Sequence, residues 1–195
     1  MSGQSLLLVA ILLPFAGAIG IVAADRWPNL REAVTLITAT AVCAIVFTIY
    51  SAFNAGAVFA VDIAEPLPGL TLRFEIEPLG MLFALVASSL WLITSVYAIG
   101  YMRGHHEHNQ TRFYAMFAIA IGSTLGAAFA GNLLTLFLCY EILTISTYPL
   151  VAHAGTDEAR RGARTYLGIL LATSIGLQLL AIMITYTVTG TLDFR

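Results

Sequence analysis

The sequence predicts an all-α membrane protein, a polytopic bundle of about six transmembrane helices. Hydrophobic residues make up 59% of its 195 residues and charged residues only 10%, whereas soluble domains carry about 25% charged residues. The apolar residues also form long uninterrupted runs, and the charges collect between these runs. A soluble protein of this length could not bury so much apolar surface in its core. This surface is therefore expected to face lipid.

Each expected helix is an apolar run long enough to cross the bilayer. A span needs about 20 apolar residues to cross roughly 30 Å of hydrocarbon. The N-terminal run lacks the basic flank of a secretory signal, so it is expected to be a membrane helix with a kink at Pro14. The runs, which we expect to form a single transmembrane domain over 1–195, are 5–24, 33–54, 78–101, 113–130, 132–152 and 163–187.

Two of the connections have informative sequences. The loop 55–77 is rich in Gly, Pro and acidic residues, and its alternating TLRFEIE segment predicts a short strand over the membrane surface. The fourth and fifth runs are joined by little more than Gly131 and Asn132, which predicts a tight antiparallel helix pair. Asn132 is the expected N-cap of the fifth helix.

The arginines predict how the bundle is oriented. The chain has nine Arg and no Lys, and alternating helices would put seven of the nine on one side. Because positive charge favours the cytoplasmic side, this predicts a protein of the bacterial cytoplasmic (inner) membrane with both chain ends extracytoplasmic. With a net charge of −2 and no basic patch, no nucleic-acid partner is expected. The seven residues, all expected in or beside loops, are Arg26, Arg31, Arg103, Arg112, Arg160, Arg161 and Arg164.

Glu141 is the candidate functional residue, because it is the one acid within an apolar run. A charge at the bilayer centre costs roughly 2.5–3.5 kcal/mol on insertion scales, so such residues usually have a function. On a helix, Thr144 and Tyr148 share its face and offer hydroxyls, and Pro149 leaves the carbonyl of Ile145 without its usual donor. Burial favours the neutral carboxyl and a nearby cation the charged one. These features predict a proton path in which Glu141 is the gating carboxylate.

Other polar residues give weaker signals. His153, at the end of the same run near Asp157 and Glu158, is a candidate for passing protons to Glu141, or a helix cap. Arg112 and Arg164 lie at membrane edges, so no partner for Glu141 is evident within the spans. A polar stripe on the sixth run fits either helix–helix contacts or the lining of a pathway, and its members are Thr173, Ser174 and Gln178.

Two competing hypotheses remain open from the residues alone. A structural subunit, in which the protonated carboxyl of Glu141 bonds a neighbouring helix, is the alternative to a transport role. The RGHHEH segment, with His105, His106, His108 and Glu107, would suit a membrane metalloenzyme, but a solvated turn has the same pattern. We therefore expect no metal and no redox cofactor, since nothing resembles a flavin, haem or iron–sulfur site.

Several segments together resemble a known family. They are FEIEPLGMLFALV, YAIGYMRG, RFYAMFAIAIGSTLGAAFAGNLLTLFLCYEILTISTYPLVAH and ARTYLGILLATS. In order and spacing they are similar to the N-terminal part of the antiporter-like proton-translocating subunits shared by Mrp-type cation/proton antiporters, respiratory complex I and membrane-bound hydrogenases. The acid-bearing GNLLTLFLCYE is the most specific segment, and EILTISTYPLVAH is closer to the Mrp and hydrogenase branches.

The resemblance implies a role for Glu141 and a partner that this sequence lacks. It matches the family's fifth-helix glutamate, which pairs with a lysine on a later, broken helix in subunits of about fourteen helices built from inverted repeats. With no lysine here, the resemblance implies a fragment, a split-gene product or an inactive truncated form. The implied function is movement of protons, in exchange for Na⁺ in some complexes, by a translocase subunit with no catalytic centre of its own. The implied partners are other membrane subunits, including a chain that supplies the lysine-bearing helices.

Overall fold

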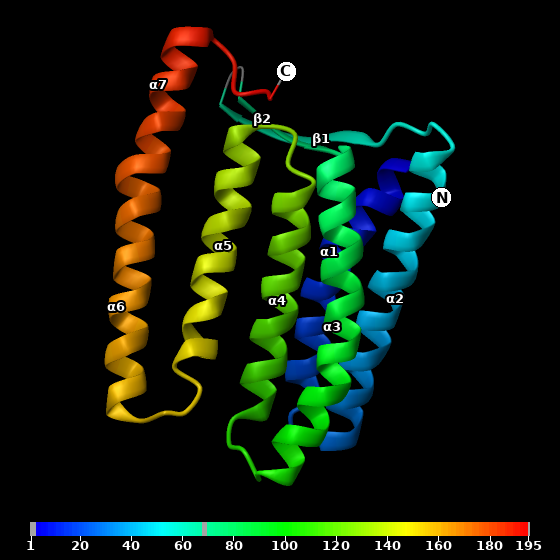
Figure 1. The fold of residues 1–195 in the computed structure, drawn as a ribbon, viewed down its shortest axis with the longest axis vertical. Coiled ribbons are helices and arrows are strands. Elements are labelled where there is room, and N and C mark those ends of the chain that lie inside the picture. The colour runs from blue at the N-terminus through cyan, green and yellow to red at the C-terminus, as the bar shows by residue number, and fades with distance from the viewer. Residues whose placement is uncertain (1–2, 68–69, 195) are drawn as a thin grey trace.

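The structure is a computed structural model that describes residues 3–67 and 70–194, and it confirms the predicted helical bundle (Figure 1). The helices run alternately up and down, and a β-hairpin lies across one end. The elements are α1 (Gly3–Ala23), α2 (Pro28–Asn54), β1 (Ala60–Leu67), β2 (Leu70–Glu75), α3 (Pro78–Gly104), α4 (Gln110–Ala128), α5 (Leu133–Val151), α6 (Asp157–Thr173), the π-helical segment η1 (Ser174–Leu179) and α7 (Leu180–Thr189).

Local sequence accounts for several helix ends. Both α2 and α3 begin at a proline, at Pro28 and Pro78, where the missing N–H would have no intrahelical partner anyway. The helix α7 ends at Gly190, whose φ of 74° lies in the left-handed region that favours glycine. Pro14 lies within α1, as expected from the sequence.

Among the described residues, five helical segments are long and apolar enough to cross a membrane, and α4 does not reach that standard. The five are α1, α2, α3, α5 and the continuous stretch Asp157–Thr189. The helix α4 instead packs against α1, α3 and α5, and many of its buried residues are Ala, Gly or Ser. Because neighbouring helices rather than lipid cover much of α4, small residues that permit close packing replace large apolar ones.

The main apolar core lies among α1, α2, α3 and α4. Its largest fully buried side chains include Trp91, Tyr114 and Phe129. Close approach depends on glycine at one point: a Cβ on Gly80 of α3 would lie 2.0 Å from the backbone oxygen of Ala128. By contrast, the Asp157–Thr189 stretch lies at the edge of the bundle beside α5 (Figure 1). Only 11% of its most apolar 18-residue segment is buried.

The predicted strand is confirmed as β2, the second strand of an antiparallel hairpin with β1. The hairpin is fixed to the turn between α4 and α5. The N–H of Glu75 donates to the carbonyl of Phe129 at 2.8 Å, and the N–H of Gly131 donates to the carbonyl of Arg73 at 2.8 Å. The hairpin therefore fixes the turn that leads into α5, at the end of the bundle.

Candidate functional site

The start of α5 is fixed by Asn132, and this confirms the predicted cap and the tight α4–α5 turn. The Asn132 side chain accepts a hydrogen bond from the N–H of Thr135 at 2.9 Å and donates to the carbonyl of Thr71 on β2 at 2.7 Å. Asn132 is 2% exposed. The cap thus sets both the first turn of α5 and its position under the hairpin.

Glu141 lies near the middle of α5, and one of its carboxyl oxygens is isolated. Its Oε1 atom is buried and has no hydrogen-bond partner among the described residues. None of the ion pairs found in the described part of the chain includes Glu141. A buried carboxyl oxygen without a partner is costly, so the site needs a proton, water or a cation to complete it.

The residues three and four positions from Glu141, which share its helix face, lie partly on packed and partly on open sides of α5. Phe137 and Thr144 are buried, at 7% and 2% exposed, whereas Leu138 and Ile145 are 38% and 59% exposed. Phe137 belongs to a small apolar cluster with Ile182 of α7. Glu141 therefore lies between the side of α5 that contacts the last helix and the side that is apolar and exposed.

The other predicted residues of this helix have different environments. Thr144 is buried, and its carbonyl accepts a hydrogen bond from the Thr147 hydroxyl at 2.8 Å. Tyr148 is half-buried, and Pro149 lies inside the last turn of α5. Thr144 and Tyr148 follow Glu141 by three and seven residues along α5, and their part in a proton path stays a prediction.

His153 lies beside Glu107 rather than in contact with the neighbouring acids of its own loop. Its Nε2 atom is 3.9 Å from the Glu107 carboxylate, and its ring packs edge-on against Phe113 with the centroids 5.4 Å apart. Both ring nitrogens are buried and lack hydrogen-bond partners within the described residues. The structure thus joins the end of α5 to the α3–α4 loop, a contact that the sequence does not reveal.

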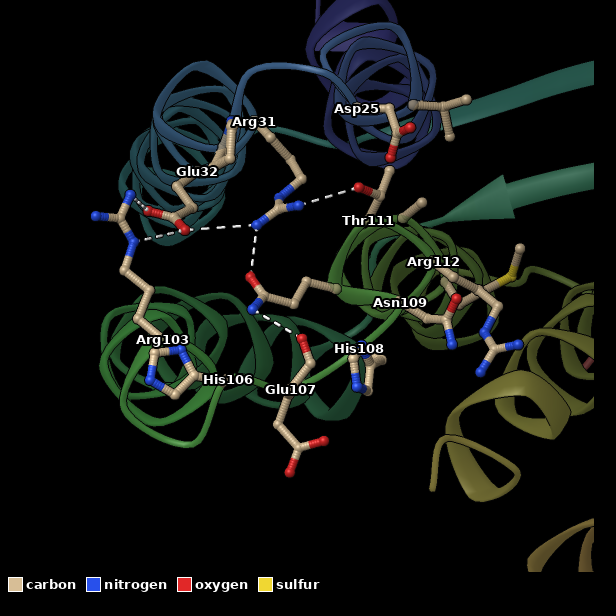
Figure 2. A pocket seen from close by; sticks show the side chains of 15 residues that line it. Asp25, Arg31, Glu32, Arg103, His106, Glu107, His108, Asn109, Thr111 and Arg112 are labelled. Atoms are coloured by element: carbon tan, nitrogen blue, oxygen red, sulfur yellow. Dashed lines mark hydrogen bonds and ion pairs between the residues drawn. The ribbon is translucent and has the colours of Figure 1, made fainter. Parts of the chain in front are cut away.

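A cavity of about 870 Å³ opens at the same end of the bundle, between the α1–α2 and α3–α4 connections (Figure 2). The Arg31 side chain lies in the wall of this cavity. The Arg31 guanidinium donates hydrogen bonds to Gln110 at 2.6 Å and to Thr111 at 3.1 Å. Glu107 lines the same cavity. Protonatable and charged groups therefore line this space, and one of them, Glu107, is also the contact of His153.

The assignment of Arg31 to a loop is wrong. Arg31 and Glu32 lie in the first turns of α2 and are only 6% and 5% exposed. Arg103, near the end of α3, donates to both oxygens of Glu32, from Nε at 2.9 Å and from Nη2 at 2.5 Å. Arg31 Nη2 lies 3.6 Å from the same carboxylate. The only signal in the sequence is opposite charge at two helix ends that the topology brings to one side.

The histidine-rich loop shows no metal-site geometry in the described residues. They contain no group of three or more His, Cys, Asp or Glu placed to hold an ion. His105 stacks on Tyr101, with ring centroids 4.2 Å apart, and a ring nitrogen lies 3.0 Å from the Tyr101 carbonyl. His106 and His108 line the cavity of Figure 2.

Two family models match the chain. Residues 130–195 match the model described as "NADH:quinone oxidoreductase/Mrp antiporter, TM". Residues 69–114 match "NADH-Ubiquinone oxidoreductase (complex I), chain 5 N-terminus". The first match includes Glu141 and the second includes Glu107.

Curated relatives and solved structures agree with these matches. NADH-quinone oxidoreductase subunit N of Desulforudis audaxviator is 34% identical over 127 residues, 65% of this chain and 25% of the relative. Putative antiporter subunit mnhD2 of Staphylococcus aureus is 25% identical over 195 residues, 98% of this chain and 38% of the relative. A probable K(+)/H(+) antiporter component of Rhizobium meliloti is 29% identical over 173 residues, 85% of this chain and 17% of the relative.

The fold is similar to chains in two membrane complexes. A chain of the Mrp complex from Dietzia sp. superimposes with a TM-score of 0.83 at 22% identity, covering 99% of this chain and 36% of that chain. A chain of the archaeal membrane-bound sulfane sulfur reductase gives 0.79 at 20% identity, covering 95% and 28%. The chain spans 17% to 38% of the length of the curated relatives named above.

Proposed function

Because the chain belongs to the antiporter-like family of Mrp and complex I membrane subunits, we propose that it moves protons across the bacterial cytoplasmic membrane by protonation and deprotonation of Glu141. It works as the N-terminal portion of a translocating subunit within a multisubunit complex. Na⁺ is the proposed exchange ion.

One observation carries this function: the buried, unpartnered Oε1 of Glu141 near the middle of α5. The buried carboxylate of Glu32, by contrast, is held by Arg103. A carboxyl with one buried oxygen that lacks a partner is completed by a proton or by a cation that approaches it. Thr144 and Tyr148 supply hydroxyls along the same helix, and Pro149 frees a carbonyl one turn away.

The cation that pairs with Glu141 comes, we propose, from helices that lie outside residues 1–195. The open side of α5 beside Glu141 and the outer faces of α7 and of the end of α6 are apolar and exposed, as at Ile145, Val188 and Ile169, which are 59%, 78% and 60% exposed. Helices that cover this surface would bring a lysine ammonium to the carboxylate. The approach of the ammonium would favour the charged form of the Glu141 carboxyl, and its departure would favour proton uptake by that carboxyl.

His153 is the proposed proton inlet. It lies at the end of the bundle that carries the connections with most of the arginines, the end we assign to the cytoplasm by the positive-inside rule. Its contact with Glu107 joins it to the wall of the large cavity. Both chain ends would then be extracytoplasmic.

Replacing the carboxyl tests the function. In the assembled complex in proteoliposomes, Glu141→Gln should lower proton flux by about 100-fold or more, the range for loss of a positioned acid–base group. Glu158→Gln, the same chemical change at an exposed position on α6, should leave the flux unchanged. Equal flux in Glu141→Gln and the parent would refute the assignment.

The same pair of variants separates transport from a purely structural role. If Glu141 only bonds a neighbouring helix, Glu141→Gln would lower the yield of complex and leave the flux per assembled complex intact. We expect the reverse, because glutamine retains hydrogen-bonding capacity but cannot carry a proton.

A further inference from the structure

The last long helix is interrupted where it lies beside α5. Between α6 and α7 the backbone forms a π-helical segment, η1, over Ser174–Leu179. This segment contacts α5. Such segments are rare, and they occur often at functional sites because they alter how side chains project from a helix.

A polar pocket lies between η1 and α5. Its volume is about 240 Å³, and it is lined by Tyr140, Thr173, Ser174 and Gln178. Tyr140 immediately precedes Glu141, and η1 lies near the middle of the stretch Asp157–Thr189. The pocket is therefore at the depth of Glu141, far from either membrane surface.

The polar groups of the pocket are unequally satisfied. The Thr173 hydroxyl donates to the carbonyls of Ile169 and Leu170, at 3.0 and 2.9 Å, and the Ser174 hydroxyl to that of Leu171 at 3.3 Å. The half-buried amide of Gln178 makes no hydrogen bond to any other described residue. A primary amide at mid-membrane depth needs partners for its donors and acceptor.

We infer that this pocket holds a small cluster of ordered water that connects Gln178 and Tyr140 to the carboxyl of Glu141. A site of this size has room for several waters, since each occupies about 30 Å³ in the liquid. The hydroxyl oxygens of Thr173 and Ser174 accept hydrogen bonds from that water while donating to their own helix. The role of the water as a proton donor and acceptor for Glu141 rests on the proposed function, but its presence does not.

Thiol reactivity tests the presence of water independently of transport. With Cys43 and Cys139 replaced by alanine, Gln178→Cys and Leu177→Cys are compared in native membranes containing the complex, using an anionic methanethiosulfonate reagent. A thiolate attacks the reagent, forms a mixed disulfide and releases methanesulfinate, and thiolates form in water and not in lipid. Leu177 is 68% exposed on the apolar surface. Reaction at position 178 should be at least about tenfold faster than at position 177, and equal rates would overturn the hydrated pocket.

Proton flux tests what the water does. Gln178→Leu should lower the flux by about tenfold or more, whereas Leu177→Ile should not. Because leucine is more favourable than glutamine in a membrane helix, loss of flux in an assembled complex cannot be attributed to poor insertion. A fast thiol reaction with full flux in Gln178→Leu would overturn the link to Glu141. Loss of flux in Glu141→Gln alone would leave the proposed function standing without this pocket.

Discussion

Replacing Glu32 with alanine should destabilise the protein because it leaves a buried cation without its counter-charge. The Glu32 carboxylate is held by two hydrogen bonds from Arg103 and lies 3.6 Å from Arg31. Arg31 is only 6% exposed. Removing one partner of a buried ion pair costs about 3–5 kcal/mol. Among the described residues, Arg31 would keep only neutral partners such as Gln110. Water in the adjoining cavity would bring the loss toward about 3 kcal/mol.

Two matched variants separate the buried charge from simple loss of contacts. Arg103→Ala should cost less than Glu32→Ala, because the Arg103 side chain is 50% exposed and Glu32 would still face Arg31. Replacing Arg31 and Glu32 together by Met and Leu should recover most of the loss, because apolar residues of similar volume often replace a buried ion pair without cost.

The assay is reversible unfolding in mixed micelles with increasing dodecyl sulfate, with the free energy of unfolding measured for each variant. The expected order of stability is parent, Arg103→Ala, then Glu32→Ala. A loss in Glu32→Ala no larger than in Arg103→Ala would refute the reasoning, because it would mean that Arg31 does not depend on Glu32.

Three further predictions concern packing, capping and the proton inlet. Gly80→Ala should destabilise the bundle by about 1–3 kcal/mol, since its Cβ would collide with the Ala128 carbonyl, whereas Gly100→Ala in the same helix meets nothing within 4 Å and should be neutral or stabilising in the same unfolding assay. Asn132→Ala should cost about 1 kcal/mol through loss of the α5 cap, and hydrogen exchange should show a frayed first turn. His153→Phe should slow proton flux in proteoliposomes at unchanged assembly, and an unaltered rate would exclude it as the inlet.

The bundle was predictable because its main signals are local. The lengths of the apolar runs predicted the helices, and the alternating TLRFEIE segment predicted the strand. The short Gly131–Asn132 link gave the tight pair, and its asparagine gave the cap. Glu141 also stood out without three-dimensional information, since one acid in a long apolar run is recognisable from neighbouring letters alone.

The remaining features depend on which helix ends meet. Arg31 was expected in a loop because charge at the edge of a span usually faces water. In the fold, the turn between α1 and α2 places Arg31 within hydrogen-bond distance of Gln110 at the start of α4. The contact of His153 with Glu107 joins residues from two different loops. The π-helical form of η1 was not predictable either: its polar residues Ser174 and Gln178 are visible in the sequence, but the change in backbone hydrogen bonding is not.

The most direct measurement is infrared difference spectroscopy of the assembled complex while an imposed pH gradient drives transport. A protonated carboxyl has its own C=O band, distinct from that of a carboxylate. If Glu141 carries the proton, a carboxyl band should appear and disappear as the gradient is applied and removed, and this band should be absent in Glu141→Gln and retained in Glu158→Gln. Steady transport with no band that depends on Glu141 would contradict the assignment.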